Sequence, residues 1–217
     1  MSSLVTKIRT LAEKETVRTL PWRLISRAAE RIGGRVRAWI WGWPRGHIGA
    51  SPRIIGSKYL HVDQNASVGR HAWIEAINHY RNCQYNPQIT IGQRFSASER
   101  LHISCISQII ILDDCLIGSS VHITDHSHGA YRGTNQCSPF TPPIIRDLIS
   151  PGPVQIGSRV WIGDNCVILG PAAIGSGSII GANSVVIGDV PPNVIAVGSP
   201  AKVVRIFNAQ TNKWDRI

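Results

Sequence analysis

The chain has 217 residues, of which 43% are hydrophobic and 17% charged, so it can form one domain with a sizeable core, alone or with an extension. No run of 18 uncharged apolar residues occurs, and basic residues interrupt the N-terminus, so we expect neither a membrane span nor a signal peptide. The five cysteines are widely spaced and form no Cys-x-x-Cys pair. They are typical of reduced thiols in a cytosolic protein, not of a disulfide framework or a zinc knot.

The net charge of +10 is concentrated near the N-terminus. Residues 1–45 hold ten Lys or Arg against three Glu, together with four of the seven tryptophans. Arginines and apolar residues each recur there every fourth position, which predicts a basic amphipathic helix interrupted at Gly33-Gly34. The two series are Arg23, Arg27, Arg31, Arg35 and Leu24, Ala28, Ile32, Val36. We therefore expect residues 1–45 to be a basic, Trp-rich helical extension.

Two roles are open for this extension. Tryptophan favours the membrane interface and arginine attracts anionic lipid, so the segment could dock on the inner face of the cytoplasmic membrane. It could instead pack across the end of the next domain, or against a neighbouring subunit, with its arginines in solvent. Nucleic-acid binding is not expected, because no recognised nucleic-acid-binding fold occurs.

A strict six-residue repeat runs from Val154 to Asp189. One aliphatic residue stands in each hexad, a small or compact residue stands two positions before it, and five of six residues three positions after it are turn formers. The aliphatic positions are Ile156, Ile162, Ile168, Ile174, Ile180 and Val186. A period of six cannot be helical, and it favours short strands joined by tight turns, three hexads to each triangular coil.

Weaker copies of the repeat lie upstream, with their phase interrupted by insertions. Ile111, Ile117 and Ile123 keep the six-residue step, as do Val68 and Ile74, and Ile91-Gly92 is similar. A coil of this kind buries its apolar side only by stacking on the next coil. The alternative, a β-sandwich of short strands, does not account for six consecutive matches at three linked positions.

The segment "VQIGSRVWIGDNCVILGPAAIGSGSIIGANSVVIGDVPPNVIAVGSPAKVVR" resembles the hexapeptide-repeat acyltransferases, which fold as a left-handed parallel β-helix. It is most similar to the branch that contains galactoside and maltose O-acetyltransferases and O-antigen and capsule O-acetyltransferases. The resemblance is strong over Pro153–Arg205, fair over residues 67–133 and poor before residue 45. It implies an all-β catalytic domain at 46–200 with a long loop at 129–153, followed by a C-terminal tail at 201–217. The left-handed winding is implied by the family alone, since general handedness rules favour the opposite hand.

The resemblance implies transfer of acetyl from acetyl-CoA to a hydroxyl, with a histidine as the general base. The family places this histidine after an aliphatic strand end, and His128 falls at that position. His126 is a close rival or an orienting neighbour, and the two rings share a face if the strand stays extended. Asp125 could hold one ring in its productive tautomer. No serine or cysteine stands in an evident nucleophile arrangement, so direct transfer is expected.

A zinc site is an alternative role for these histidines, because related β-helix enzymes bind zinc through three histidines. His122, His126 and His128 could supply three ligands, but His122 alternates to the other face of the strand. The "SPAK" ending belongs to the branch that uses CoA. No metal is therefore expected.

The resemblance also implies residues that contact the CoA thioester and its phosphates. Trp161 matches a tryptophan beside the thioester, and the basic residues Lys202 and Arg205 match cations near the phosphates. Gly163, Ala182 and Ser199 lie at points that border the pantetheine arm. This sequence departs from the family at Ile187-Gly188, where relatives often carry Thr-Lys, so one expected cation is missing.

The segment Gly129–Pro153 is about ten residues longer than the matching loop of galactoside acetyltransferases, and long loops are often functional. Tyr131, Arg132 and Arg146 could hydrogen-bond or stack on a sugar, as could Phe140, although a loop stiffened by prolines would serve structure alone.

The resemblance thus implies a homotrimeric O-acetyltransferase with active sites between subunits. The expected acceptor is a sugar of a bacterial surface polysaccharide or its precursor, in the cytoplasm or at the inner membrane. The alternatives are N-acetylation of a nucleotide sugar or another small acceptor, and a zinc-binding or non-catalytic β-helix protein.

Overall fold

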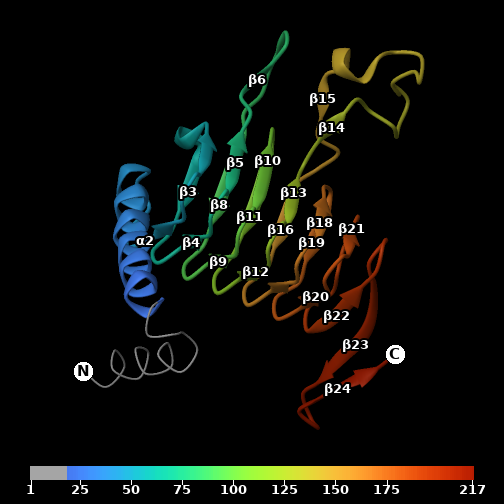
Figure 1. The fold of residues 1–217 in the computed structure, drawn as a ribbon. Coiled ribbons are helices and arrows are strands. Elements are labelled where there is room, and N and C mark those ends of the chain that lie inside the picture. Colours follow the sequence, from blue (N-terminus) through green and yellow to red (C-terminus); the bar gives the residue numbers. More distant parts are fainter. Residues whose placement is uncertain (1–18) are drawn as a thin grey trace.

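The computed structural model describes residues 19–217, and the first part of the predicted extension, residues 1–18, lies outside the described residues. Three parallel sheets form the faces of a prism (Figure 1). Face A contains, in spatial order, β1 (His47–Ile48), β4 (Ser67–Val68), β9 (Ser96–Ala97), β12 (Leu116–Ile117), β17 (Trp161–Ile162), β20 (Ile179–Ile180) and β22 (Val194–Val197). Face B contains β2 (Arg53–Ile55), β5 (Trp73–Ala76), β10 (His102–Cys105), β13 (His122–Thr124), β18 (Val167–Leu169) and β21 (Val185–Val186). Face C contains β3 (Leu60–Val62), β8 (Gln88–Ile91), β11 (Gln108–Ile111), β16 (Val154–Ile156) and β19 (Ala172–Ile174).

The chain passes through faces A, B and C in turn and then starts again one coil higher. This is the left-handed parallel β-helix with an N-terminal helix that the repeat and the resemblance predicted. The predicted six-residue series is the core: Ile156, Ile162, Ile168, Ile174, Ile180 and Val186 are all buried. Each stacks on its equivalent in the next coil, as Ile111 pairs with Ile156 and then Ile174. Burying one such side chain contributes about 1.5–3 kcal/mol, so stacking is the main source of stability.

The predicted turn formers bend the chain at the prism corners. Asn165, Gly177 and Asn183 have positive φ angles between 56° and 73°, and so does Arg159, the one residue of this series that is not a turn former. Asparagine and glycine adopt this left-handed conformation at little cost, whereas most side chains do so at about 1–2 kcal/mol. The buried small positions Ser178 and Ser184 stay satisfied, because each hydroxyl donates to a carbonyl of a turn.

The interruptions of the repeat all fall at the corner between faces B and C. The hairpin β6 (His79–Tyr80) and β7 (Cys83–Gln84) leaves the prism there in the second coil. The long loop leaves it in the fourth coil and carries β14 (Ser127–His128), the 3₁₀ turn η2 (Pro143–Ile145) and β15 (Leu148–Ile149). Figure 1 shows both insertions projecting from the same edge of the prism. In the first coil the short 3₁₀ turn η1 (Ser57–Tyr59) occupies this corner.

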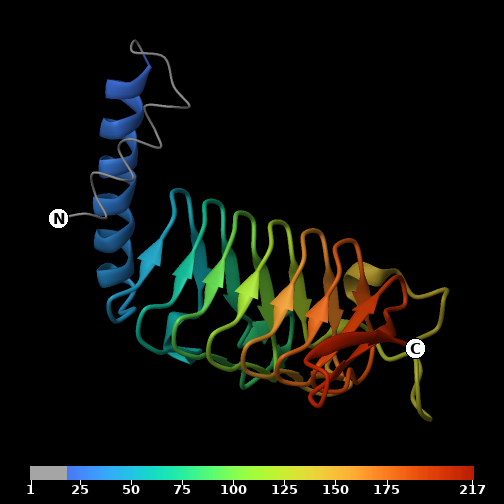
Figure 2. The same cartoon turned by 90° about the horizontal axis from the view of Figure 1, so that it is seen from below.

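Helix α2 (Leu20–Ile40) lies across the N-terminal end of the prism and extends past it (Figure 2). The helix continues through Gly33-Gly34, where an interruption was expected. A Cβ on Gly34 would lie 2.0 Å from Nε2 of His47, so glycine here lets the helix approach the first coil. Ala38 and Trp43 are buried in the same core cluster as the coils. The C-terminal end of the segment predicted as an extension therefore caps the core.

The last residues extend face A by an antiparallel hairpin. Strand β23 (Lys202–Asn208) pairs with β22, and β24 (Lys213–Arg216) pairs with β23. This hairpin occupies the segment expected to be a C-terminal tail. Within residues 19–217, no helix combines the length and the apolar character needed to cross a bilayer.

Candidate active site

Asp125 lies at the point where the chain leaves the prism after β13, and its side chain is fully buried. Its carboxylate accepts hydrogen bonds from the backbone N–H groups of Ile106, Ser107 and Gln108, at 3.0, 2.7 and 2.8 Å. These N–H groups come from the corner of the coil below. That corner holds two extra residues, since Ile103 and Ile111 are eight positions apart where the repeat would have six. The irregular corner thus forms a cradle for one buried carboxylate.

The hydrogen bonds keep Asp125 ionised in spite of its burial. Desolvation raises the pKa of this carboxyl, but the hydrogen bonds from His126, from the N–H groups of Ile106 and Ser107 and from the Cys105 thiol outweigh it. The net effect is a pKa below the ordinary value of 3.8. A buried carboxylate with several N–H donors behaves in this way, so Asp125 carries a negative charge at neutral pH.

His126 lies directly against that carboxylate, with Nδ1 3.0 Å from Oδ1 of Asp125. An ionised carboxylate can only accept a hydrogen bond, so Nδ1 carries the proton and Nε2 keeps its lone pair. The Thr124 hydroxyl is 3.1 Å from the same Nδ1 and fixes the ring further. The side chain of His126 is 10% exposed. It borders a cavity of about 600 Å³ between the long loop and the fifth coil.

His128 has different surroundings. The chain bends at Asp125 and then enters β14, away from the prism. His128 lies in β14, which pairs antiparallel with β15, and it is exposed. Its ring contacts Tyr80 of the second-coil hairpin edge to face, with centroids 5.5 Å apart. It is absent from the cavity lining, and no carboxylate contacts it within the described residues.

A stack of aromatic rings follows the outer side of face B next to His126. Arg53 lies over Trp73, Trp73 stacks on His102 at 4.2 Å, and Nδ1 of His102 is 2.9 Å from Nδ1 of His122. Burial lowers the pKa of His122 to about 4, and the nearby His102 and His126 add to the shift. His122 is therefore neutral at neutral pH. In the part of the chain that the structure describes, no three His, Cys, Asp or Glu side chains are arranged to bind a metal, so His122, His126 and His128 do not form such a group.

The residues expected to contact CoA lie elsewhere on the prism. Trp161 points outward from face A and is 50% exposed. Gly163 and Ala182 lie at the corner between faces A and B in successive coils, where a Cβ on Gly163 would be 2.6 Å from the Ala182 nitrogen. Ser199 follows β22 and is exposed. Within one chain these residues are thus separate from the Asp125–His126 pair, which stands at the corner between faces B and C.

The two predicted phosphate-binding cations lie on β23. Lys202 is exposed and pairs in register with Val197. Arg205 pairs with Ile195 and donates from Nη1 to the Trp214 carbonyl at 3.1 Å. Lys202 is accordingly the freer of the two cations. Ile187 is exposed and borders the cavity beside His126.

The predicted sugar-binding residues of the long loop, except Phe140, either hold the loop together or border the cavity. Arg146 donates to the carbonyls of Ser138 and Thr141 and to the Tyr131 hydroxyl, so its guanidinium holds the loop together. Tyr131 in turn donates to the His128 carbonyl. Tyr131 and Arg132 border the cavity, and Arg132 is exposed. Phe140 is 93% exposed and lies outside the cavity.

The sequence did not predict that the hairpin of the second coil contacts the long loop of the candidate active site. Tyr80 and Arg81 donate to the Ile144 carbonyl, and Tyr85 donates to the Leu148 carbonyl at 3.1 Å. The hairpin therefore supports the long loop from below. The only signal in the sequence was the phase slip between Ile74 and Ile91.

A family model described as bacterial transferase hexapeptide (six repeats) matches residues 153–188, the segment that builds β16 to β21. This segment of the chain therefore carries the six-residue repeat that the family model describes. The structure of a mutant of AntD, an N-acyltransferase from Bacillus cereus, in complex with dTDP and coenzyme A, has the same fold. It aligns with a TM-score of 0.50 at 16% identity, over 77% of this chain and 87% of the AntD chain.

Two curated relatives of this protein come from Escherichia coli K12. A protein named as a lipopolysaccharide biosynthesis O-acetyl transferase, WbbJ, is 40% identical over 129 residues, which are 59% of this chain and 65% of WbbJ. Galactoside O-acetyltransferase is 34% identical over 148 residues, which are 66% of this chain and 64% of that enzyme. The match therefore spans just under two thirds of the length of either relative.

Proposed function

We propose that this protein transfers acetyl from acetyl-CoA to a hydroxyl group of a sugar in a bacterial surface polysaccharide, O-antigen or capsule, or in its precursor. The hexapeptide-repeat match over residues 153–188 and the names of both curated relatives support O-acetyl transfer. The observation that carries the proposal is the Asp125–His126 pair at the edge of a cavity of about 600 Å³. The sugar is the finer part of the proposal and rests on the WbbJ name and on the polar loop residues of the cavity.

In the proposed mechanism, His126 is the general base and Asp125 orients it. Nε2 takes the proton of the acceptor hydroxyl as the oxygen attacks the thioester carbonyl, which gives a tetrahedral intermediate. The intermediate collapses with loss of the CoA thiolate, and the imidazolium returns the proton to that sulfur. The products are the acetyl ester and CoA. The Asp125 carboxylate stabilises the transient imidazolium, because it is ionised and fixed 3.0 Å from Nδ1.

Direct transfer is favoured over an acetyl-enzyme. The cysteine nearest to the pair is Cys105, whose thiol lies 3.4 Å from the Asp125 carboxylate. Burial strongly raises the pKa of this thiol, and the charge of Asp125 raises it further, so it is not a nucleophilic thiolate. Burial likewise raises the pKa of Cys115 and Cys166.

The proposed CoA site lies between subunits of a homotrimer. Trp161, Gly163 and Ala182 would line the thioester end of the site, and Ser199, Lys202 and Arg205 the distal end. Their separation from His126 within one chain supports a site that needs a second copy. The five cysteines are all free, which suits the proposed cytoplasmic location.

The first test replaces each histidine separately. We expect His126→Ala to lower kcat by about 10²–10⁴-fold, the usual contribution of a general base. The matched control is His128→Ala, which should change kcat less than tenfold, because this exposed ring has no carboxylate partner among the described residues. Rates are measured as CoA release from acetyl-CoA with a saccharide acceptor. Loss of activity in His128→Ala with an active His126→Ala would reverse the assignment.

The acceptor itself is tested with labelled acetyl-CoA and a panel of sugars, oligosaccharides and amino sugars. We expect label in a base-labile ester on a sugar hydroxyl, with its position read by NMR. A base-stable amide on an amino sugar would identify an N-acetyltransferase instead. Stoichiometric zinc with no acetyl transfer would contradict both assignments.

A further inference from the structure

Helix α2 presents an apolar stripe on the side that faces away from the prism. The stripe consists of Trp22, Ile25, Ile32, Val36 and Trp39, at successive steps of three, seven, four and three residues. Such spacing keeps all five side chains within one face of a helix. All five are at least half exposed, and Trp22 and Trp39 at the two ends are 71% and 80% exposed. The opposite side, at Gly34, Ala38 and Trp41, packs on the first coil.

This stripe differs from the apolar series expected from the four-residue period. That series placed Leu24 and Ala28 with Ile32 and Val36, whereas Trp22 and Trp39 share the exposed side. Two of the four N-terminal tryptophans, Trp41 and Trp43, serve the core. Only Trp22 and Trp39 remain available for a partner.

The charged side chains on the other sides of α2 are almost all positive. Arg23, Arg27, Arg31, Arg35 and Arg45 are exposed, and the one acidic residue of α2 is Glu30. Glu30 is directed inward, where it accepts from Arg37 and from the Ala50 N–H. Arg27, Arg31 and Arg35 have no acidic partner among residues 19–217. Helix α2 therefore has an apolar side and a basic side, the pattern of helices that lie in the interface of an anionic membrane.

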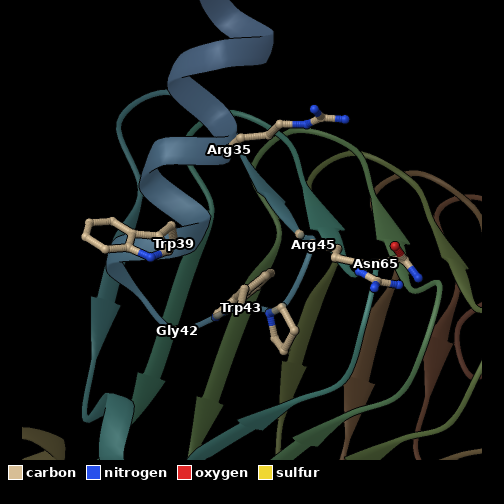
Figure 3. A pocket seen from close by; sticks show the side chains of 8 residues that line it. Arg35, Trp39, Gly42, Trp43, Arg45 and Asn65 are labelled. Carbon is tan, nitrogen blue, oxygen red and sulfur yellow. The ribbon is translucent and has the colours of Figure 1, made fainter.

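A shallow cavity adjoins the C-terminal end of the stripe. It has a volume of about 710 Å³ and is bordered by Arg35, Trp39, Trp43, Arg45 and Asn65. Figure 3 shows Arg35 and Arg45 extending to the same side, with Asn65 next to Arg45, while the Trp39 ring projects to the other side of the helix. The cationic and amide side chains on one side suit phosphate groups, and the indole on the other side suits the apolar zone of a membrane interface.

We propose that the α2 stripe docks on an anionic membrane surface, with Trp22 and Trp39 at the boundary between headgroups and acyl chains and the arginines among lipid phosphates. A second copy of the helix is a poor partner, because two helices that each carry this excess of positive charge repel each other. Residues 1–18 are also net basic, with four Lys or Arg against two Glu. An anionic bilayer complements both the apolar stripe and the charge.

The membrane contact predicted for residues 1–45 would thus be made by one face of α2. This contact would also fix the orientation of the prism relative to the bilayer. The helix spans about 31 Å at 1.5 Å per residue and lies across the end of the prism (Figure 2). A bilayer against the stripe would meet that end, with the later coils and the long loop directed away from the lipid.

The test is flotation of the full chain with vesicles of phosphatidylcholine alone and of phosphatidylcholine with about 30% phosphatidylglycerol. We expect binding to the anionic vesicles only, weakened by high salt. The stripe variant Ile32→Ser/Val36→Ser and the charge variant Arg31→Gln/Arg35→Gln should each bind at least about tenfold more weakly, since each arginine near the surface contributes substantially. Exposed residues far from α2 provide the matched controls, Ile217→Ser and Arg216→Gln, which should bind like wild type.

Thermal unfolding and acetyl transfer to a soluble acceptor verify that the variants are folded, because the substituted side chains are exposed. Wild-type chain that stays unbound from anionic vesicles overturns the proposal. The proposal is also overturned if the stripe variant binds the anionic vesicles as strongly as wild type. If the stripe variant has a smaller oligomeric mass than wild type, the stripe is an interface between copies of the chain. If the chain binds anionic vesicles only after deletion of residues 1–18, that segment blocks the stripe in the full chain.

Discussion

The Asp125 carboxylate depends on three consecutive backbone N–H groups that belong to another coil. A carboxylate can be fully buried when several donors replace the lost water, and here Ile106, Ser107 and Gln108 supply them. The sequence predicted that Asp125 could orient a histidine, and it identified both candidate rings. It favoured His128, with His126 as a close rival, because the bend at Asp125 and the antiparallel pairing of His128 arise from the long loop and leave no local signal.

His122 gives a prediction for the dependence of stability on pH. Its folded-state pKa of about 4 is below the value of about 6.5 in an unfolded chain, so between these values the unfolded state binds the extra proton. Its contribution to stability is therefore complete above about pH 6.5 and is lost as the pH falls toward 4. We expect the free energy of unfolding of wild type to fall more between pH 7 and pH 5 than that of His122→Gln, measured by urea denaturation. Equal losses, or an NMR titration midpoint of His122 near 6.5, would contradict this.

At the scale of elements, the repeat predicted the regular coils well and the irregular corners poorly. Strands β16 to β21 follow the hexads residue by residue, since each aliphatic side chain has only one inward position. The insertions all leave from the corner between faces B and C, where they contact each other through Tyr80, Tyr85 and the long loop. No local pattern specifies such contacts, because they join residues more than sixty positions apart.

The junction of α2 with the first coil gives a matched pair of substitutions. A Cβ on Gly34 would meet the His47 ring at 2.0 Å, whereas a Cβ on Gly33 would meet only the flexible end of Arg37, at 3.1 Å. Alanine exceeds glycine by about 1 kcal/mol in helix propensity, so Gly33→Ala should be neutral or stabilising. Gly34→Ala should lower the free energy of unfolding by about 1–3 kcal/mol, the usual cost of overpacking.

Denaturant unfolding monitored by circular dichroism measures both variants. The double variant Gly34→Ala/His47→Ala serves as the control, because it removes the ring that the new methyl group meets and should recover part of the loss. A Gly34→Ala variant as stable as Gly33→Ala would show that the close approach is not needed.

At the scale of the molecule, the prism separates two groups of predicted site residues. The Asp125–His126 pair stands at the corner between faces B and C, whereas Trp161 points out from face A. A rigid stack of coils cannot bring these positions together within one chain. The proposed trimer resolves this, because a closed ring of three copies sets one surface of each subunit against a different surface of its neighbour.

Complementation between inactive chains tests the shared site. In a mixed trimer of His126→Ala and Trp161→Ala chains, one of the three interfaces joins an intact His126 to an intact Trp161. We therefore expect co-expressed chains with different tags to recover about one third of wild-type activity in each purified mixed trimer. Trimers mixed from His126→Ala chains alone are the inactive control. Sedimentation as a monomer, or mixed trimers that stay inactive, would contradict the shared site.

The sequence by itself determined the prism, because a side chain that recurs every six residues can be buried only by stacking short rungs. It also determined which residue types could do acid–base chemistry, and that an amphipathic helix lies in the N-terminal segment. Tertiary structure decided the rest. It chose His126 as the ring that contacts a buried carboxylate, directed Trp41 and Trp43 to the core, and left Trp22 and Trp39 exposed. Those outcomes depend on which distant segments come into contact at a corner or at an end of the prism. Only these tertiary contacts determine which side chains are buried and which hydrogen bonds form.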